Sequence, residues 1–172
     1  IYEGKPIKVM PLEGAEKLVI EGESFEAFNT SGGCATMCET YADKVENLTY
    51  KTIRYPGHLN HMKFLFNDLH LKKNKDILEK LFDKEVPRTK NDLIIFFVKV
   101  IGLIDGVLQE KTYLRKIYGD ERFSAIQLTT ASGACSALKM FLDGKILSKG
   151  FIKQESLSWD DFTDNKFGNV YK

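Results

Sequence analysis

The sequence lacks a long apolar run, a strong net charge and the short motifs of nucleotide and zinc sites. Its longest apolar run, residues 93–98, stops at Lys99 and is far too short to span a membrane. A formal net charge of +1 gives no reason to expect nucleic acid or an anionic membrane as partner. Neither GxGxxG nor GxxxxGKS/T occurs, so the chain itself offers no cofactor-binding fingerprint for a nucleotide.

Cysteine is scarce, with three residues in the chain. An odd number favours free thiols in a reducing, cytoplasmic setting, and no signal-peptide pattern follows Ile1. Cys34 and Cys38 are four residues apart but lack a second cysteine pair, and His58 and His61 occur without HExxH. We therefore expect reduced cysteines and no bound metal.

Length and composition predict one α+β domain. The 172 residues are 43% hydrophobic and 28% charged, and no repeat or linker divides them. Strand and helix patterns alternate irregularly, which favours a mixed β-sheet covered by helices. Strands are expected at residues 6–10, 17–21, 24–29, the start of 49–58, 92–103, 107–118 and 151–154. Helices are expected at residues 35–41, 58–70, 75–84, 123–143 and near 159–165.

Residues 92–103 carry the strongest strand pattern. They are nearly all apolar, and a strand that is apolar on both faces is expected to be buried at the centre of a sheet. Asp105-Gly106 predicts a hairpin that returns residues 107–118 as an antiparallel partner. A second hairpin is predicted at Glu21-Gly22-Glu23.

The long helix at residues 123–143 has an apolar side and a stripe of small residues. Its expected buried side consists of Ile126, Thr130, Gly133, Ala134, Ala137, Leu138 and Phe141. The small stripe, Thr129, Ser132, Gly133 and Ser136, predicts close approach of another backbone. Gly144 is expected to end the helix.

A strand passes directly into a helix within residues 49–58. Thr52 and Arg54 are two residues apart, so their side chains point to the same face of the strand. Pro56-Gly57 ends the strand, and apolar residues at helical spacing follow directly. Arg54, Tyr55 and His58 therefore lie where a strand meets a helix N-terminus, a place that commonly faces an anion-binding crevice. The alternative is an ordinary strand end with an exposed arginine that pairs with a local carboxylate such as Glu39.

A polar turn, residues 29–33, precedes the helix expected at residues 35–41. Its backbone N–H groups could receive an anion, but a Ser/Thr N-cap with glycines for the turn explains the same residues. No nucleophile–base pair can be identified from spacing, so the catalytic residues stay unknown at this level.

Eight stretches match one known family in order. They are residues 26–33 (EAFNTSGG), 38–40 (CET), 50–58 (YKTIRYPGH), 109–110 (QE), 124–127 (SAIQ), 130–133 (TASG), 149–155 (KGFIKQE) and 165–168 (NKFG). These stretches resemble the saccharopine dehydrogenase family, especially its bacterial saccharopine and carboxynorspermidine dehydrogenase-like members. The resemblance covers nearly the whole chain.

The resemblance implies a second, substrate-binding and dimerisation domain. In the family an N-terminal Rossmann domain, which this chain lacks, binds NAD or NADP, and the second domain resembles the C-terminal domain of glyceraldehyde-3-phosphate dehydrogenase. The family oxidises a secondary amine, such as saccharopine in lysine metabolism, to an imine that water cleaves into an amino acid and a semialdehyde. We expect this domain to form a homodimer and to be inactive by itself.

The resemblance also implies a substrate site. Arg54 matches the family's strand arginine, which would hold a substrate carboxylate, and Thr52 matches a substrate-contacting threonine. Asn29 and Thr30 match the turn that lines the same pocket, and Tyr55 and His58 complete the candidate set. Some fungal members have arginine at the position of Thr30, so a second carboxylate clamp is weaker or absent here.

Two alternatives remain open. The chain can belong to a carboxynorspermidine dehydrogenase in polyamine synthesis, or to a relative without catalysis that acts as a small-molecule binding or scaffold protein. Activity of the full-length protein on each amine separates these alternatives.

Overall fold

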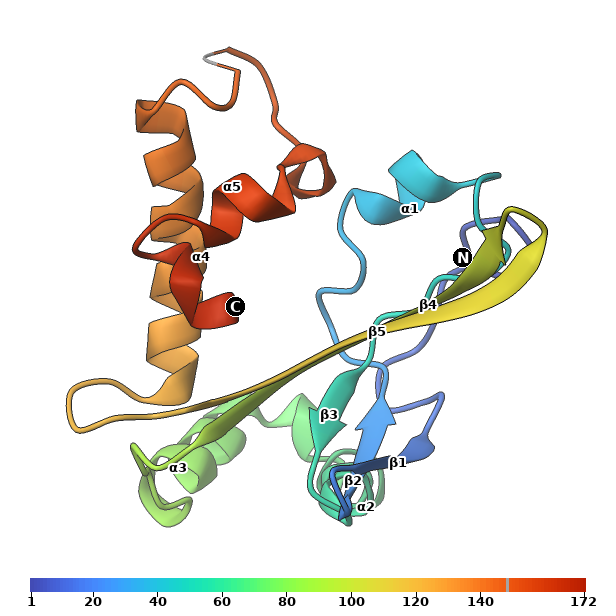
Figure 1. Cartoon of the computed structure of the whole chain (residues 1–172). Helices are drawn as coiled ribbons and strands as arrows, with labels where there is room; N and C mark the ends of the chain where they lie inside the picture. The colour runs from blue at the N-terminus through green and yellow to red at the C-terminus, as the bar shows by residue number, and fades with distance from the viewer. Residues whose placement is uncertain (148) are drawn as a thin grey trace. The chain divides into compact units, whose positions relative to one another are not determined.

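The structure, a computed structural model, describes residues 1–147 and 149–172. These residues form two compact units, Ile1–Pro87 and Arg88–Lys172, each with its own antiparallel sheet and helices (Figure 1). The predicted α+β class is confirmed. The predicted single mixed sheet is wrong for the described residues, because their strands pair antiparallel in two separate sheets.

The sheet of the first unit has the strand order β1-β2-β3. Its strands are β1 (Glu16–Ile20), β2 (Glu23–Phe28) and β3 (Thr52–Arg54). The predicted hairpin at Glu21-Gly22 is confirmed, since both residues have the positive φ, 52° and 83°, that a two-residue turn favours. The buried apolar core of this unit consists of Ile1, Ile20, Phe25, Ala27, Phe28 and Leu59.

The helices of the first unit follow the predicted ranges with shifted ends. They are α1 (Met37–Tyr41), α2 (His58–Lys63), the π-helical η1 (Phe64–Asp68), the 3-10 helix η2 (Leu71–Lys73) and α3 (Lys75–Glu85). As predicted, α2 begins directly after the Pro56-Gly57 turn, and it continues into η1. The start of α1 is two residues later than predicted, because Ala35 has a φ of 47°, which interrupts a right-handed helix.

Two predicted short strands do not form. Residues 6–10 have no regular structure, and residues 151–154 give way to the 3-10 helix η3 (Gln154–Ser156). Ile7 and Val9 are more than half exposed, and so is Phe151. An extended segment needs a neighbouring strand to satisfy its backbone, and within the described residues neither segment has one.

The second unit contains a long hairpin of β4 (Leu93–Ile104) and β5 (Val107–Tyr118), which pair along their whole length (Figure 1). The predicted turn at Asp105-Gly106 is confirmed, and both residues have positive φ. The hairpin is followed by α4 (Ala125–Leu142), η3, α5 (Trp159–Thr163) and η4 (Gly168–Tyr171). Of the helices in the described residues, none is both long enough and apolar enough to cross a membrane.

The prediction that residues 92–103 are buried on both faces is wrong. The first four residues of β4 are half-buried, and the rest of the strand is exposed, with Leu103 at 72%. In its two-stranded sheet β4 pairs with β5 alone, and α4 packs against the hairpin. Apolar side chains therefore remain uncovered on the part of the hairpin near its turn.

The predicted buried side of α4 is also wrong. Ile126, Leu138 and Phe141 are exposed, and the buried residues are Ala125, Thr129, Ser132, Ser136 and Met140. The buried side is set by the last segment of the chain, which packs on the small residues of the helix. Ser136 Oγ on α4 donates a hydrogen bond to the carbonyl oxygen of Phe162 at 2.5 Å, and a Cβ placed on Gly168 would lie 2.9 Å from Ser136 Oγ. The predicted approach of another backbone to the small stripe is therefore confirmed, as is the helix end at Gly144, which has a φ of 70°.

Candidate functional site

The predicted site residues lie in the first unit, around the ends of β2 and β3 and the start of α2. In the antiparallel pairing Phe28 is opposite Thr52, and Glu26 is opposite Arg54. The chain that leaves β2 therefore passes beside the start of β3. The side-chain oxygens of Thr30 and Thr52 lie 2.5 Å apart in a hydrogen bond, so two of the predicted residues are brought together.

Arg54 is the last residue of β3, and its side chain is exposed. Its Nη1 donates a hydrogen bond to the carbonyl oxygen of Ile53 at 3.0 Å, which folds the guanidinium back along the strand end. A planar guanidinium at such a position can present two N–H groups to one carboxylate. The strand end therefore provides the chemistry of a carboxylate receptor.

Glu26 occupies the helix N-terminus that the sequence suggested for an anion. Its Oε2 accepts the backbone N–H of Gly57 at 3.1 Å, and its Oε1 accepts that of Leu59 at 2.6 Å. The expectation that this helix end faces an open anion crevice is therefore corrected, because a carboxylate of the protein already binds there.

The role of Glu26 was missed because its partners lie 31 and 33 residues further along the chain. One local signal was available. The N-cap position of α2 is Gly57, which has no side chain to accept the first N–H groups, so a remote acceptor was needed.

His58 begins α2 beside these two charged residues. Its ring stacks on that of Phe28, with the centroids 6.1 Å apart and an interplanar angle of 22°. Desolvation of the ring lowers the pKa of His58, as does the nearby charge of Arg54 and, more weakly, His61, whereas Glu26 acts in the opposite direction. His58 is therefore biased toward the neutral form, in which one ring nitrogen can accept a proton.

Tyr55 and Asn29 are held by neighbours outside this cluster. The ring of Tyr55 lies 5.5 Å from that of Phe25 and is more than half exposed. The backbone N–H of Asn29 donates to Glu13, and its carbonyl oxygen accepts from Leu12. Its side chain packs over Gly14, where an added Cβ would lie 3.0 Å from Nδ2.

The polar turn at residues 29–33 does not open a helix. Three residues separate it from α1, whose N-cap is Thr36 and has no side-chain cap hydrogen bond. Both interpretations assumed that a helix begins directly after this turn, and that assumption is wrong. Beyond it, burial and the neighbouring Cys38 raise the pKa of the Cys34 thiol.

The second unit has a hollow of about 350 Å³ beside the C-terminal end of α4. It is lined by Lys139, Met140, Asp143, Lys145, Asp161, Asp164, Asn165 and Lys166. Lys145 pairs with Asp161 at 2.5 Å, which raises the pKa of the lysine and lowers that of the aspartate. Lys139 and Asp143 form a second ion pair at the same hollow.

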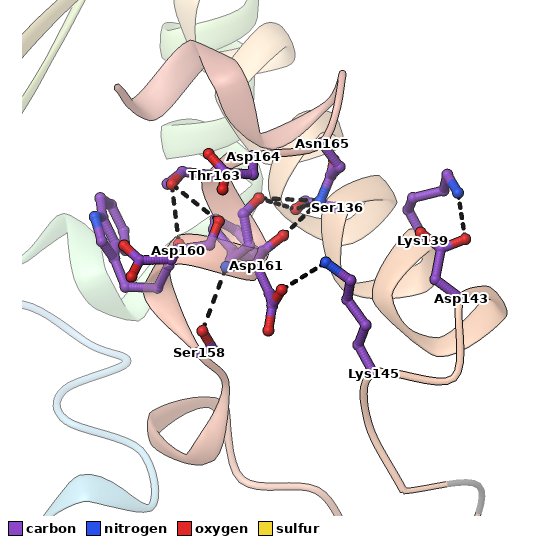
Figure 2. Close-up of polar contacts among 12 residues, drawn as sticks. Ser136, Lys139, Asp143, Lys145, Ser158, Asp160, Asp161, Thr163, Asp164 and Asn165 are labelled. Atoms are coloured by element: carbon purple, nitrogen blue, oxygen red, sulfur yellow. Dashed lines mark hydrogen bonds and ion pairs between the residues drawn. The ribbon is translucent and has the colours of Figure 1, made fainter.

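The wall of this hollow is a structural network. Asn165 Nδ2 donates to Ser136 Oγ at 2.7 Å (Figure 2). Asn165 Oδ1 accepts from the backbone N–H groups of Phe167 and Gly168. Because these polar groups bind one another, the hollow has the features of a packed helix junction. The first-unit cluster is the stronger candidate site.

No model of a known protein family matches the sequence. Within the described residues, no group of three histidine, cysteine, aspartate or glutamate side chains is placed to hold a metal ion. The family resemblance and the site residues stay predictions at this point.

Proposed function

We propose that this chain is the substrate-binding and dimerisation domain of an NAD(P)-dependent, saccharopine dehydrogenase-like oxidoreductase. The reaction is oxidation of a secondary amine, saccharopine in the first instance, or the reverse. The domain relates to the C-terminal domain of glyceraldehyde-3-phosphate dehydrogenase, and the enzyme works in the cytoplasm. The observation that carries the proposal is the exposed Arg54 at the end of β3, beside His58 and two residues beyond the Thr30–Thr52 hydroxyl pair.

The chemistry of this cluster suits an amino-acid substrate. Arg54 holds one carboxylate in a bidentate pair, and the hydroxyl groups of Thr30 and Thr52 provide neutral hydrogen bonds nearby. A neutral His58 at the same strand end can accept a proton. These groups bind and orient a substrate, and hydride transfer needs the nicotinamide.

The described residues do not fit NAD(P) themselves. Dinucleotide sites of the Rossmann type need a parallel βαβ unit with a glycine-rich turn that opens a helix. The described sheets are antiparallel, and the glycine turn at residues 32–33 is separated from α1 by three residues. We assign cofactor binding to a Rossmann domain outside these 172 residues.

One observation favours a second substrate. Thr30 stands where some fungal relatives have arginine, and its hydroxyl is hydrogen-bonded to Thr52. A site with one arginine suits a substrate with fewer carboxylates than saccharopine, such as carboxynorspermidine in polyamine synthesis.

The proposed homodimer forms through the hairpin and α4. Exposed apolar residues gather on both elements: Val98, Val100, Ile101, Leu103, Val107, Leu108, Leu138 and Phe141. Exposed apolar area of this extent marks an interaction surface. Sedimentation over a wide concentration range should show a dimer, and a monomer at every concentration would contradict this part of the proposal.

The direct test is activity of the full-length protein. Saccharopine and carboxynorspermidine are each supplied with NAD⁺ or NADP⁺, and reduced nicotinamide is measured by absorbance. Turnover of saccharopine supports the first assignment, and turnover of carboxynorspermidine alone supports the second. A protein that binds the dinucleotide but oxidises neither amine would contradict both.

A further inference from the structure

Cys34 and Cys38 are a pair of thiols that the proposed function does not use. Cys34 lies in the turn before α1, Cys38 lies in the first turn of that helix, and both residues are half-buried. The two thiols are hydrogen-bonded to each other. The third cysteine, Cys135, lies on α4 in the second unit. The first unit therefore holds two thiols whose sulfur atoms are already in contact.

The backbone around this pair allows the two sulfur atoms to come closer. A disulfide bond is about 2.05 Å long, which is shorter than any hydrogen bond between thiols. The backbone N–H of Met37 donates to the carbonyl oxygen of Cys34 at 3.0 Å and holds Cys34 against the start of α1. Before Cys34, both Gly32 and Gly33 have positive φ, and no heavy atom beyond their chain neighbours lies within 4 Å of an added Cβ. The turn can therefore shift toward the helix without a clash.

α1 is the element that a bond between these residues would affect. The helix has five residues, and its N-cap, Thr36, makes no side-chain cap hydrogen bond. Helices of this length have little stability of their own. Two of its backbone hydrogen bonds, from Thr40 to Thr36 and from Ala42 to Cys38, are each 3.1 Å long. A covalent link at the first turn would hold the helix start in place.

We propose that Cys34 and Cys38 are a reversible modification site, which a low-molecular-weight disulfide converts into an intramolecular disulfide that fixes the first turn of α1. This inference goes beyond the proposed function and does not rest on it. In a reducing compartment the dithiol prevails, and the bond forms when the share of oxidised small thiols rises.

The conversion is a thiol–disulfide exchange in two steps. The thiolate of Cys38 attacks one sulfur of the small disulfide, forms a mixed disulfide and releases one small thiolate. Cys34 then gives its proton to solvent and attacks the Cys38 sulfur, which forms the intramolecular bond and releases the second small thiolate. The protein loses two electrons and two protons, and the small disulfide is reduced to two thiols. Burial raises the pKa of Cys34, as does the neighbouring Cys38, so Cys34 keeps its proton longer and attacks second.

The direct test uses the 172-residue chain with oxidised glutathione as the small disulfide. After equilibration with a mixture of reduced and oxidised glutathione, the remaining thiols are alkylated and the chain is cut with cyanogen bromide. Met37 lies between the two cysteines, so their fragments stay joined only if a disulfide links them. At about 0.1 mM reduced glutathione the linked product should exceed the mixed disulfide by about tenfold or more, because tethered groups reach millimolar effective concentrations.

Three variants test the assignment of the thiols. Cys135→Ser is the matched control and should give the same linked product as the wild type. Cys34→Ser should stop at the mixed disulfide on Cys38. Cys38→Ser should react more slowly than Cys34→Ser, because the remaining thiol is the one with the raised pKa. The reverse order of rates would overturn the assigned order of attack.

Hydrogen exchange measures the effect of the bond on α1. In the oxidised chain the amides of Thr40 and Ala42 should exchange roughly three- to tenfold more slowly than in the reduced chain. The amides of α4 should exchange at unchanged rates and serve as the internal control.

Two results would overturn the inference. Separated fragments in the wild type, with glutathione or the alkylating reagent on each cysteine, would show that the two thiols do not form a bond. A linked product with unchanged exchange at Thr40 and Ala42 would show that the bond does not fix α1. Neither measurement uses turnover, so failure of the proposed function leaves both readouts intact.

Discussion

In each unit a carboxylate from a distant part of the chain accepts the first N–H groups of a helix, but the two helices differ in how many other acceptors they have. In the second unit Asp92 accepts the backbone N–H groups of Ala125 and Ile126, and Ser124 and Gln127 add a reciprocal capping box. In the first unit the N-cap of α2 is a glycine without a side-chain cap, and Glu26 supplies the acceptors.

The N-terminus of α4 is packed within its own unit, whereas the N-terminus of α2 lies beside the candidate site. The N-terminus of α4 has both local and remote hydrogen-bond acceptors, so other acceptors remain when one is removed. The end of α2 depends on one carboxylate that lies opposite the arginine proposed to bind substrate. Loss of the carboxylate should therefore destabilise the start of α2 more than the start of α4, and substitution of Arg54 should affect activity rather than stability.

The largest expected effect is a loss of stability in the second unit. In Gly168→Ala the new Cβ would meet the Phe162 carbonyl oxygen at 1.7 Å and Ser136 Oγ at 2.9 Å, so η4 must move away from α5 and from the small residues of α4. We expect a loss of roughly 3 kcal/mol in the free energy of unfolding. The control is Gly102→Ala on β4, where nothing lies within 4 Å of the new atom. Equal denaturation midpoints for the two variants would contradict the packing described here.

The next effect is on activity without loss of stability. Arg54→Ala in the full-length enzyme should lower kcat/KM ten- to a hundredfold, since a charge-assisted pair contributes roughly 1.5–3 kcal/mol. Arg54→Lys should recover part of the loss, because an ammonium group cannot form the bidentate pair. Unchanged steady-state kinetics together with a melting temperature lowered by several degrees would assign Arg54 a structural role.

A smaller effect is expected on the free energy of unfolding when either helix-capping carboxylate, Glu26 or Asp92, is removed. Glu26→Ala should lower the free energy of unfolding by about 2 kcal/mol, because the first N–H groups of α2 lose their acceptor. Asp92→Ala should cost about 1 kcal/mol, because the capping box at Ser124 remains. Urea denaturation of both variants measures the difference. A larger loss for Asp92→Ala would mean that the capping box does not compensate.

The smallest effect is on the titration of His58. Its charged neighbours are Arg54 and His61, which lower its pKa, and Glu26, which raises it. Arg54→Ala should therefore move the pKa of His58 up toward its ordinary value, and Glu26→Gln should move it further down. The imidazole signals of His58, followed by NMR against pH, measure both shifts. Shifts in the same direction would show that the two charges do not act on the ring independently.

The lowered pKa of His58 also determines how the stability of the folded protein changes with pH. The pKa of His58 in the folded protein is below its unfolded value of about 6.5. The unfolded state then binds more protons than the folded state between these two values. Stability from this residue is therefore complete above pH 6.5 and decreases as the pH falls toward the folded pKa.

Features set by neighbouring residues could be predicted from the sequence. The turns at Glu21-Gly22 and Asp105-Gly106 need positive φ at two successive positions, and acidic residue–glycine pairs supply it. The placement of Arg54 at a strand end before a helix follows from Pro56-Gly57 in the same way.

Features set by distant residues could not be predicted. Glu26 has an ordinary place on a strand, and nothing near it in the sequence indicates that its partners are Gly57 and Leu59. On α4 the apolar side chains suggested one buried side, but a close backbone contact needs small residues, so the opposite stripe is buried. The apolar pattern of β4 predicted burial that the described residues of the chain do not provide.

The contact between α4 and the last segment also affects how the protein is made. The Tyr171 hydroxyl donates to the carbonyl oxygen of Thr129, 42 residues earlier, and Ser136 and Asn165 join the same helix and segment. At a synthesis rate of about 5–20 residues per second, α4 waits roughly 2–8 seconds for Tyr171. The first unit ends at Pro87, before α4 has been synthesised. During translation the strand end that carries Arg54 can therefore fold while the small-residue face of α4 is still open.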